Sequence, residues 1–202
     1  MRRPPSGLAA SMKIAVIGTG NIGRTLGGRW STAGHDVVYG SRAGSGDGPG
    51  GAPLTSVAEA LGDAEVVVLA VPGPAVADVA AANGAALAGK VVIDAANRIG
   101  EPEVNSRAAI TTAAPQAHYV RAFNTLGWEN FADPPAGAAM FFAADPAARP
   151  AAEELITAVG VEPVFAGDAD ASGTVDALLP LWFALVKHNG GHRTTALGIV
   201  SS

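Results

Sequence analysis

Two kinds of segment alternate along most of the chain. Short apolar, β-branched runs that do not alternate with polar residues are typical of strands buried on both faces. We predict such strands at residues 13–17, 36–40, 65–70, 90–94, 118–123, 138–143 and 161–165. Segments with apolar residues at helical spacing separate or follow them, at residues 21–33, 56–61, 74–87, 146–159 and 172–187. This alternation predicts an α/β fold, with one doubly wound, mostly parallel sheet, helices on both faces and a C-terminal helix.

Two stretches stand outside this pattern. Residues 43–53 hold five glycines and two prolines, which predicts a mobile loop. Residues 1–11 precede a second methionine, Met12, and the prolines at positions 4 and 5 interrupt any apolar run there. We interpret residues 1–11 as a disordered leader or extended start, not a targeting signal. We expect residues 12–202 to form one domain with a C-terminal extension.

A glycine motif lies at the first strand–helix junction. Gly18-Thr19-Gly20-Asn21-Ile22-Gly23 fits G-x-G-x-x-G, and it follows a predicted strand and opens a predicted helix. Gly18 permits the tight turn, Gly20 lets the backbone approach a pyrophosphate, and Gly23 lets helix and strand pack closely. The alternative is a structural glycine turn in another α/β fold. The context favours a Rossmann-type dinucleotide site, with the phosphates at the helix N-terminus.

The end of the second strand indicates which dinucleotide is bound. NAD-binding proteins place an acidic residue there, whereas this chain has Gly40-Ser41-Arg42, and Asp36 lies too early to replace it. A hydroxyl and a guanidinium bind the 2′-phosphate of NADP. The alternative is that Arg42 is a solvated loop residue. We predict NADP(H) as the cofactor.

Composition excludes several other functions. Only 15% of residues are charged and the formal net charge is −5, which argues against a nucleic-acid partner. We see no apolar run of the roughly 18 residues that a membrane span needs, and we expect a cytoplasmic protein. Cysteine is absent, and Gly190 and Gly191 interrupt the His188–His192 pair, so we expect no metal site.

Four blocks of sequence resemble the coenzyme F-420-dependent NADP oxidoreductase family. They are MKIAVIGTGNIGRTLGGRWSTAGHDVVYGSR (12–42), AVPGPAVADV (70–79), GKVVIDAANRI (89–99) and VRAFNTLGWENFADP (120–134). The C-terminal LLPLWFALVKHNGG (178–191) is similar to that family's last helix. The resemblance implies an enzyme that exchanges hydride between NADP(H) and F-420. It also implies that NADP contacts Thr19, Gly20, Asn21, Ile22, Ser41, Arg42, Val71, Pro72, Asn97 and Ala122.

Direct hydride transfer needs alignment more than acid–base groups, and the sequence offers no convincing catalytic residue. We place the acceptor at the carboxyl ends of the strands, where such folds bind ligands. The residues there are Val71, Pro72, Asn97, Asn124, Thr125 and Leu126, with Asn189 at the end of the last helix. An NADPH reductase of another small acceptor (flavin, ferric chelate, carbonyl or imine) and a non-catalytic NADPH sensor stay open. The apolar C-terminal helix predicts a possible homodimer.

Overall fold

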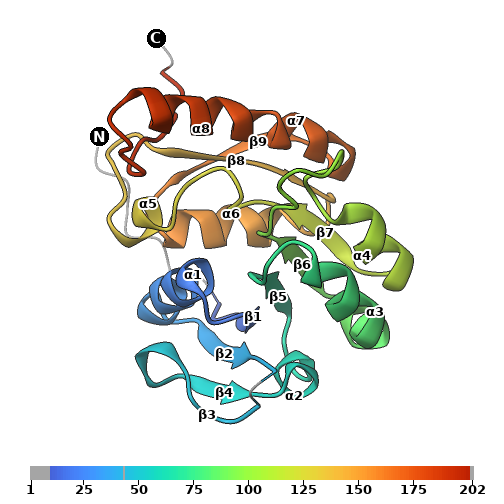
Figure 1. Cartoon of the computed structure of the whole chain (residues 1–202). Coiled ribbons are helices and arrows are strands. Elements are labelled where there is room, and N and C mark those ends of the chain that lie inside the picture. The colour runs from blue at the N-terminus through green and yellow to red at the C-terminus, as the bar shows by residue number, and fades with distance from the viewer. Residues whose placement is uncertain (1–9, 43, 201–202) are drawn as a thin grey trace.

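A nine-stranded sheet runs through the protein (Figure 1). The computed structural model describes residues 10–42 and 44–200. The strand order is β3-β4-β2-β1-β5-β6-β7-β8-β9. The strands are β1 (Lys13–Ile17), β2 (Asp36–Gly40), β3 (Gly46–Asp47), β4 (Pro53–Thr55), β5 (Val66–Leu69), β6 (Val91–Asp94), β7 (His118–Arg121), β8 (Ala139–Ala144) and β9 (Glu162–Gly167).

Most neighbouring strands are parallel, as predicted. The exceptions are β3, antiparallel to β4, and β8, antiparallel to β7, whereas β9 is parallel to β8. From β1 the chain passes to β2 on one side, and it later returns to β5 on the other side. The direction of winding therefore changes between β1 and β5, which opens a crevice at their carboxyl ends.

Helices cover both faces of the sheet, because its strands are buried on both sides. In β1, Ile14 and Val16 face one core and Ala15 and Ile17 face the other. The first core includes side chains from α1 (Asn21–Thr32), α5 (Glu129–Ala132) and α6 (Arg149–Ala158). The second includes side chains from α2 (Val57–Leu61), α3 (Ala75–Leu87) and α4 (Arg107–Ala113). This arrangement confirms the predicted doubly wound architecture.

The prediction of one helix over residues 172–187 is wrong. The segment forms α7 (Ser172–Asp176) and α8 (Leu178–His188), after a 3₁₀ turn at Ala169–Ala171. Pro180 has no backbone N–H, so it cannot bond to the carbonyl of Asp176, and the helix is interrupted there. Figure 1 shows α7 and α8 beside β8 and β9.

Residues Ala169–His188 are long and apolar enough to cross a membrane by length and composition, contrary to our expectation of no such stretch. This is weak evidence for a membrane span, since core helices of soluble proteins pass the same test. Leu179 and Trp182 of α8 are buried in this fold. Among the residues of known placement, no group of three His, Cys, Asp or Glu side chains could hold a metal ion.

Other boundaries differ from the sequence-based prediction. Residues 44–53 are not only a loop, because β3 and a 3₁₀ turn (Pro49–Gly51) lie there and β4 then extends the sheet beside β2. The predicted strand 118–123 ends at Arg121, since Phe123 has a φ of +62° that no strand accommodates. The helix predicted from residue 146 begins at Arg149. Helices α4 and α5 were not predicted, because α4 buries only Ile110 and α5 has four residues.

Most of the predicted leader lies outside the described residues. Residues 1–9 and Ala43 are not described. The fold is anchored at Met12, whose backbone N–H donates to Nδ1 of His35 over 3.2 Å. Its carbonyl accepts a bond of 3.0 Å from the N–H of Asp36.

Candidate cofactor-binding site

The glycine turn between β1 and α1 has the geometry that a bound pyrophosphate needs. Gly18 has a φ of +113°, and a Cβ there would lie 2.5 Å from the carbonyl oxygen of Ala70. A Cβ on Gly23 would collide with the carbonyl oxygen of Gly18. Around Gly20, by contrast, nothing lies within 4 Å of the position that a Cβ would take. Two glycines therefore permit close packing, and the third leaves open space for a ligand against the backbone.

The N-terminus of α1 is ready to bind an anion. Gly20 is its N-cap residue, and no side chain caps the helix. The first turn contains no acidic residue either. Backbone N–H groups in this turn therefore point toward the open space with the positive end of the helix dipole behind them. A phosphate placed there receives hydrogen bonds that the chain itself does not supply.

A pocket of about 380 Å³ extends from this turn along the crevice. It brings together most of the predicted nucleotide contacts, namely Gly18, Thr19, Gly20, Ser41, Arg42, Val71 and Pro72. The remaining lining residues are Ile17, Gly40, Val57, Ala70, Ala75, Asp78 and Val79. The predicted residues Asn21, Ile22 and Gly23 lie in the first turns of α1, next to this pocket rather than in its lining.

Ser41 and Arg42 immediately follow β2, at the wall of the pocket where the adenosine ribose of a dinucleotide would lie. The backbone N–H of Ser41 donates to the carbonyl of Thr55 over 3.1 Å, which holds the strand end in place. Arg42 is exposed. The nearest acidic residue of β2 is Asp36, at the opposite end of the strand. The residues present therefore fit NADP, with a cation where NAD-binding sites carry a carboxylate.

A buried charged network lies behind the carboxyl ends of β6 and β7. Arg121 is fully buried, and its Nε donates to Oδ1 of Asp176 over 2.7 Å. Its two terminal nitrogens reach the carbonyl of Asp94 at 3.0 Å and Oδ1 of Asn97 at 2.7 Å. The carboxylate of Asp94 lies 3.4 Å from Nη1 of Arg121. One guanidinium thus ties β6, β7 and α7 together.

This network orients two of the predicted acceptor residues. Nδ2 of Asn97 donates to the carbonyl of Asn124 over 2.8 Å. Nδ2 of Asn124 donates to Oδ1 of Asp176 over 3.1 Å, whereas its Oδ1 is buried without a partner. The structure therefore brings Asn97 and Asn124 together at the end of the sheet, each bonded to a member of the Arg121 network.

Burial sets the protonation of the groups behind this edge. It raises the pKa of the Asp94 carboxyl, against the opposing effect of Arg121. Burial and the adjacent Asp94 raise the pKa of Tyr119 well above 10.0, so its hydroxyl stays protonated. That hydroxyl lies 3.1 Å from Oδ2 of Asp94, which also accepts from the backbone N–H of Ser106 over 2.7 Å. These groups stabilise one another, and their hydrogen bonds serve the folded structure.

The turn after β7 is set by aromatic packing. Phe123 takes a positive φ of +62°, which is rare for a bulky residue. Its ring lies between those of Trp30 and Phe131, each at a centroid distance of 5.6 Å. The backbone therefore turns sharply just before Asn124, and such local strain is found at functional sites.

The other predicted site residues do not lie in the open pocket. Thr125 and Leu126 are buried at 4% and 7% exposure, and Ala122 is fully buried. Asn189 follows α8, is exposed, and bonds through Nδ2 to the carbonyl of Leu185 over 2.7 Å. Its described hydrogen bonds do not reach Asn97 or Asn124. The roles of all four residues stay predictions.

Sequence reasoning missed Arg121, Asp94 and Asp176. A signal was present, because Arg121 interrupts the apolar and aromatic run of residues 119–123, and a buried charge needs a partner. Nothing in the spacing indicates which carboxylates those partners are, since Asp176 lies 55 residues away.

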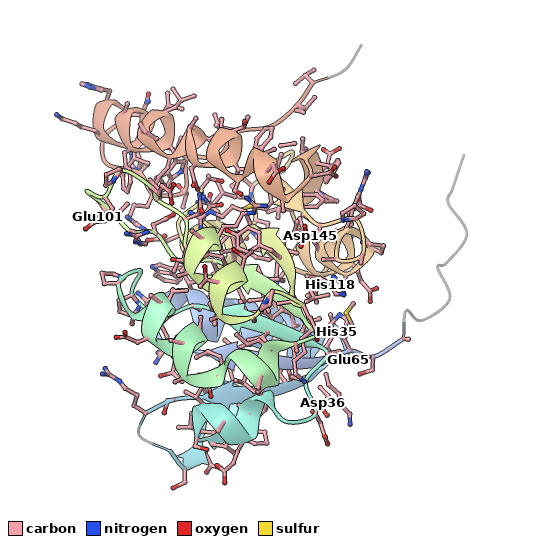
Figure 2. The ribbon with its side chains drawn as sticks, turned by 90° about the vertical axis from the view of Figure 1, so that its right-hand side faces the viewer. His35, Asp36, Glu65, Glu101, His118 and Asp145 are labelled. Atoms are coloured by element: carbon pink, nitrogen blue, oxygen red, sulfur yellow. The ribbon has the colours of Figure 1, made fainter. Side chains whose placement is uncertain are left out.

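The opposite edge of the sheet has a different character. Figure 2 shows titratable side chains along the amino ends of the parallel strands, at His35, Asp36, Glu65, His118 and Asp145. Glu101, in the loop after β6, lies on the other side of the molecule. The pocket and the strand ends beside it are therefore separate from this charged edge.

The fold is of the Rossmann type, and this pocket has the features that a dinucleotide site needs. Residues 13–98 match the sequence model of the family described as NADP oxidoreductase, coenzyme F420-dependent. The resemblance seen in the sequence is thereby confirmed over residues 13–98.

Solved structures of similar fold include two that are 28% identical to this chain. A candidate F420-dependent NADP reductase from Arthrobacter sp. FB24 is 28% identical, with a TM-score of 0.81. The match covers 95% of this chain and 100% of that one. A hypothetical protein from Sinorhizobium meliloti is also 28% identical, with a TM-score of 0.67 and coverages of 80% and 88%. An NADPH-bound reductive aminase from Aspergillus terreus, 21% identical, shares the fold over 89% of this chain and 64% of its own. Its TM-score is 0.67.

Proposed function

We propose that this protein transfers hydride between NADPH and the deazaflavin coenzyme F-420. The observation that carries the cofactor part is the pocket in which the uncapped N-terminus of α1 and the Ser41–Arg42 pair meet. One feature suits a pyrophosphate and the other suits a 2′-phosphate. The family match supports F-420 as the acceptor, and so does the Arthrobacter structure.

The nicotinamide half of the cofactor would extend from the pocket toward the ends of β5, β6 and β7. Val71 and Pro72 follow β5, and Asn97 follows β6. The loops carrying them are in contact, because a Cβ on Gly73 would collide with the carbonyl of Asn97. The Arg121 network holds the Asn97 side chain, so this wall of the site is rigid before a ligand arrives. Rigid walls suit a reaction that depends on holding two rings at contact distance.

Beyond this alignment, hydride transfer to F-420 needs no acid–base residue from the protein. NADPH supplies a hydride, and reduction of F-420 takes that hydride together with one proton from solvent, leaving NADP⁺. The titratable groups Asp94, Tyr119 and Asp176, which lie behind this edge, are each engaged in the buried network. A carbonyl or imine reductase needs a positioned proton donor, whereas a deazaflavin can take its proton from water.

One steady-state assay tests the proposal. The purified protein is mixed with NADPH and, separately, with F-420, free flavin, a ferric chelate, and carbonyl and imine substrates. We expect loss of the visible absorbance of F-420 coupled to NADPH oxidation, and at least about tenfold lower kcat/KM for each other acceptor. Turnover with another acceptor alone contradicts the assignment of F-420. Tight NADPH binding with no turnover contradicts an enzymatic role and favours a redox sensor.

A further inference from the structure

Asp78 has a carboxylate in a pocket built for anions. It lies in the first turn of α3, where Ala75, Asp78 and Val79 all line the pocket. These positions have i, i+3 and i+4 spacing, so one face of α3 lines the same pocket as Ser41 and Arg42. Asp78 is exposed, and the described part of the chain supplies it with no hydrogen bond or ion pair. No other acidic residue lines the pocket in that part of the chain.

The other polar groups of the pocket have partners in the nucleotide already. The glycine turn takes the pyrophosphate, and Ser41 and Arg42 take the 2′-phosphate, so all of them bind oxygen anions. A carboxylate repels those anions and binds hydrogen-bond donors. The donors in the adenosine half of NADP are the 3′-hydroxyl of the ribose and the exocyclic amine of adenine. The ribose lies next to its 2′-phosphate, hence on the side of Ser41 and Arg42.

Adenine then lies against the part of the pocket that α3 lines, which includes Asp78. Val79 lies beside it on α3, and Val57, the first residue of α2, also lines the pocket. Apolar side chains of this kind suit the flat faces of a purine, and a polar group suits its edge. We propose that the Asp78 carboxylate accepts a hydrogen bond from the 6-amino group of adenine and makes the pocket selective for a 6-aminopurine.

This inference rests on the proposed cofactor site and gives it a base preference. A 6-oxopurine places an oxygen where the amine was, so a charge-assisted bond is replaced by repulsion between lone pairs. A site built to bond one polar group discriminates strongly against an analogue that lacks it. We expect wild-type protein to bind NADPH at least about tenfold more tightly than the reduced nicotinamide hypoxanthine dinucleotide phosphate.

Two variants test the assignment in titrations with both nucleotides. Asp78→Ala removes the acceptor, so we expect weaker NADPH binding and a ratio of dissociation constants near one. Asp78→Asn retains an acceptor and adds an N–H donor for the 6-oxo group, so the analogue gains affinity and the ratio also approaches one. Asp63→Ala is the matched control, since it removes the same charge from an exposed site at the amino edge of the sheet and leaves the ratio unchanged.

A structural role for Asp78 gives a different result. An acidic residue in a first helical turn stabilises the helix through its dipole, so its loss lowers the melting temperature. Such an effect weakens the binding of both nucleotides equally and preserves the ratio of their dissociation constants. An unchanged ratio in both variants, or equal affinities in the wild type, overturns the assignment while leaving NADPH binding intact. Absence of NADPH binding to the wild type contradicts the proposed cofactor site as well.

Discussion

At the scale of single residues, two arginines show how environment decides what a charge does. Arg42 is exposed beside an open pocket, so its guanidinium is available to a ligand. Arg121 is fully buried, and its donors are used by Asp94, Asn97 and Asp176. Exposed charges are stabilised by water, whereas a buried charge depends on its partners. We therefore expect substitution of Arg42 to reduce nucleotide affinity and substitution of Arg121 to reduce stability.

Reversing the charge of Arg42 should affect one nucleotide much more than the other. We expect Arg42→Glu to weaken NADPH binding by about 2 kcal/mol or more, because a charge-assisted contact becomes a repulsion. NADH has no 2′-phosphate, so its binding should change little. Titration of both nucleotides measures the difference, and Lys187→Glu, at an exposed position in the last turn of α8, controls for net charge. Equal losses for NADPH and NADH would show that Arg42 does not bind the phosphate.

Removal of the Arg121 guanidinium should reduce stability severely. We expect Arg121→Leu to lower the free energy of unfolding by about 3–5 kcal/mol, because the buried Asp94 and Asp176 carboxylates lose their counter-charge. Urea denaturation followed by circular dichroism measures this change. Arg107→Ala is the comparison, since its pair with Asp170 is largely exposed and is worth about 1 kcal/mol or less. Similar losses in the two variants would contradict the role assigned to the buried network.

At the scale of elements, the site depends on how closely two loops approach. Gly73 lies in the loop between β5 and α3, and a Cβ there would collide with the Asn97 carbonyl in the loop after β6. The same Asn97 is bonded through its side chain to Arg121. The two loops therefore form one wall, and its shape depends on the absence of a side chain at position 73.

Adding one methyl group at position 73 should change the site without removing any contact. We expect Gly73→Ala to lower the melting temperature by several degrees and to reduce kcat/KM, because the loops must separate. Gly28→Ala in α1 is the matched control, since nothing lies within 4 Å of its Cβ position. Alanine favours a helix over glycine, so the control should be neutral or slightly more stable. A Gly73→Ala variant that behaves like Gly28→Ala would show that the loops are not tightly coupled.

At the scale of the whole molecule, α8 leaves apolar surface uncovered. Leu179 and Trp182 pack inward, while Leu181 and Phe183 are 48% and 44% exposed. The ring of Phe183 lies 5.2 Å from that of Trp182, so the exposed and buried parts of this surface are continuous. Apolar patches of this kind mark interaction surfaces.

The partner that we expect on this surface is a second copy of the chain. A two-fold dimer brings the same patch together from both subunits, and it would cover both exposed side chains. Sedimentation at micromolar concentration should then report a dimer for the wild type and a monomer for Leu181→Asp. Thr112→Asp, on the exposed side of α4, should remain dimeric. A monomeric wild type would contradict the prediction.

Local pattern was sufficient for much of the architecture and for the nucleotide half of the site. Buried parallel strands are continuous apolar runs, and glycine turns need particular residues at adjacent positions, so both are visible in a short window of sequence. Helices α4 and α5 were not predicted, because each buries too few residues to show a helical period in its sequence. The break between α7 and α8 needed the position of Pro180 relative to the carbonyl of Asp176.

The sequence by itself determined the doubly wound class, the turn at Gly18–Gly23 and the cation at Arg42, since each depends on neighbouring residues and on local backbone geometry. Tertiary structure alone decided which carboxylates stabilise Arg121, because Asp94 and Asp176 lie 27 and 55 residues away along the chain. It also decided that Asp78 lines the same pocket as Ser41 and Arg42. Such pairings arise when separate elements pack, and chain spacing carries no record of which surfaces will meet.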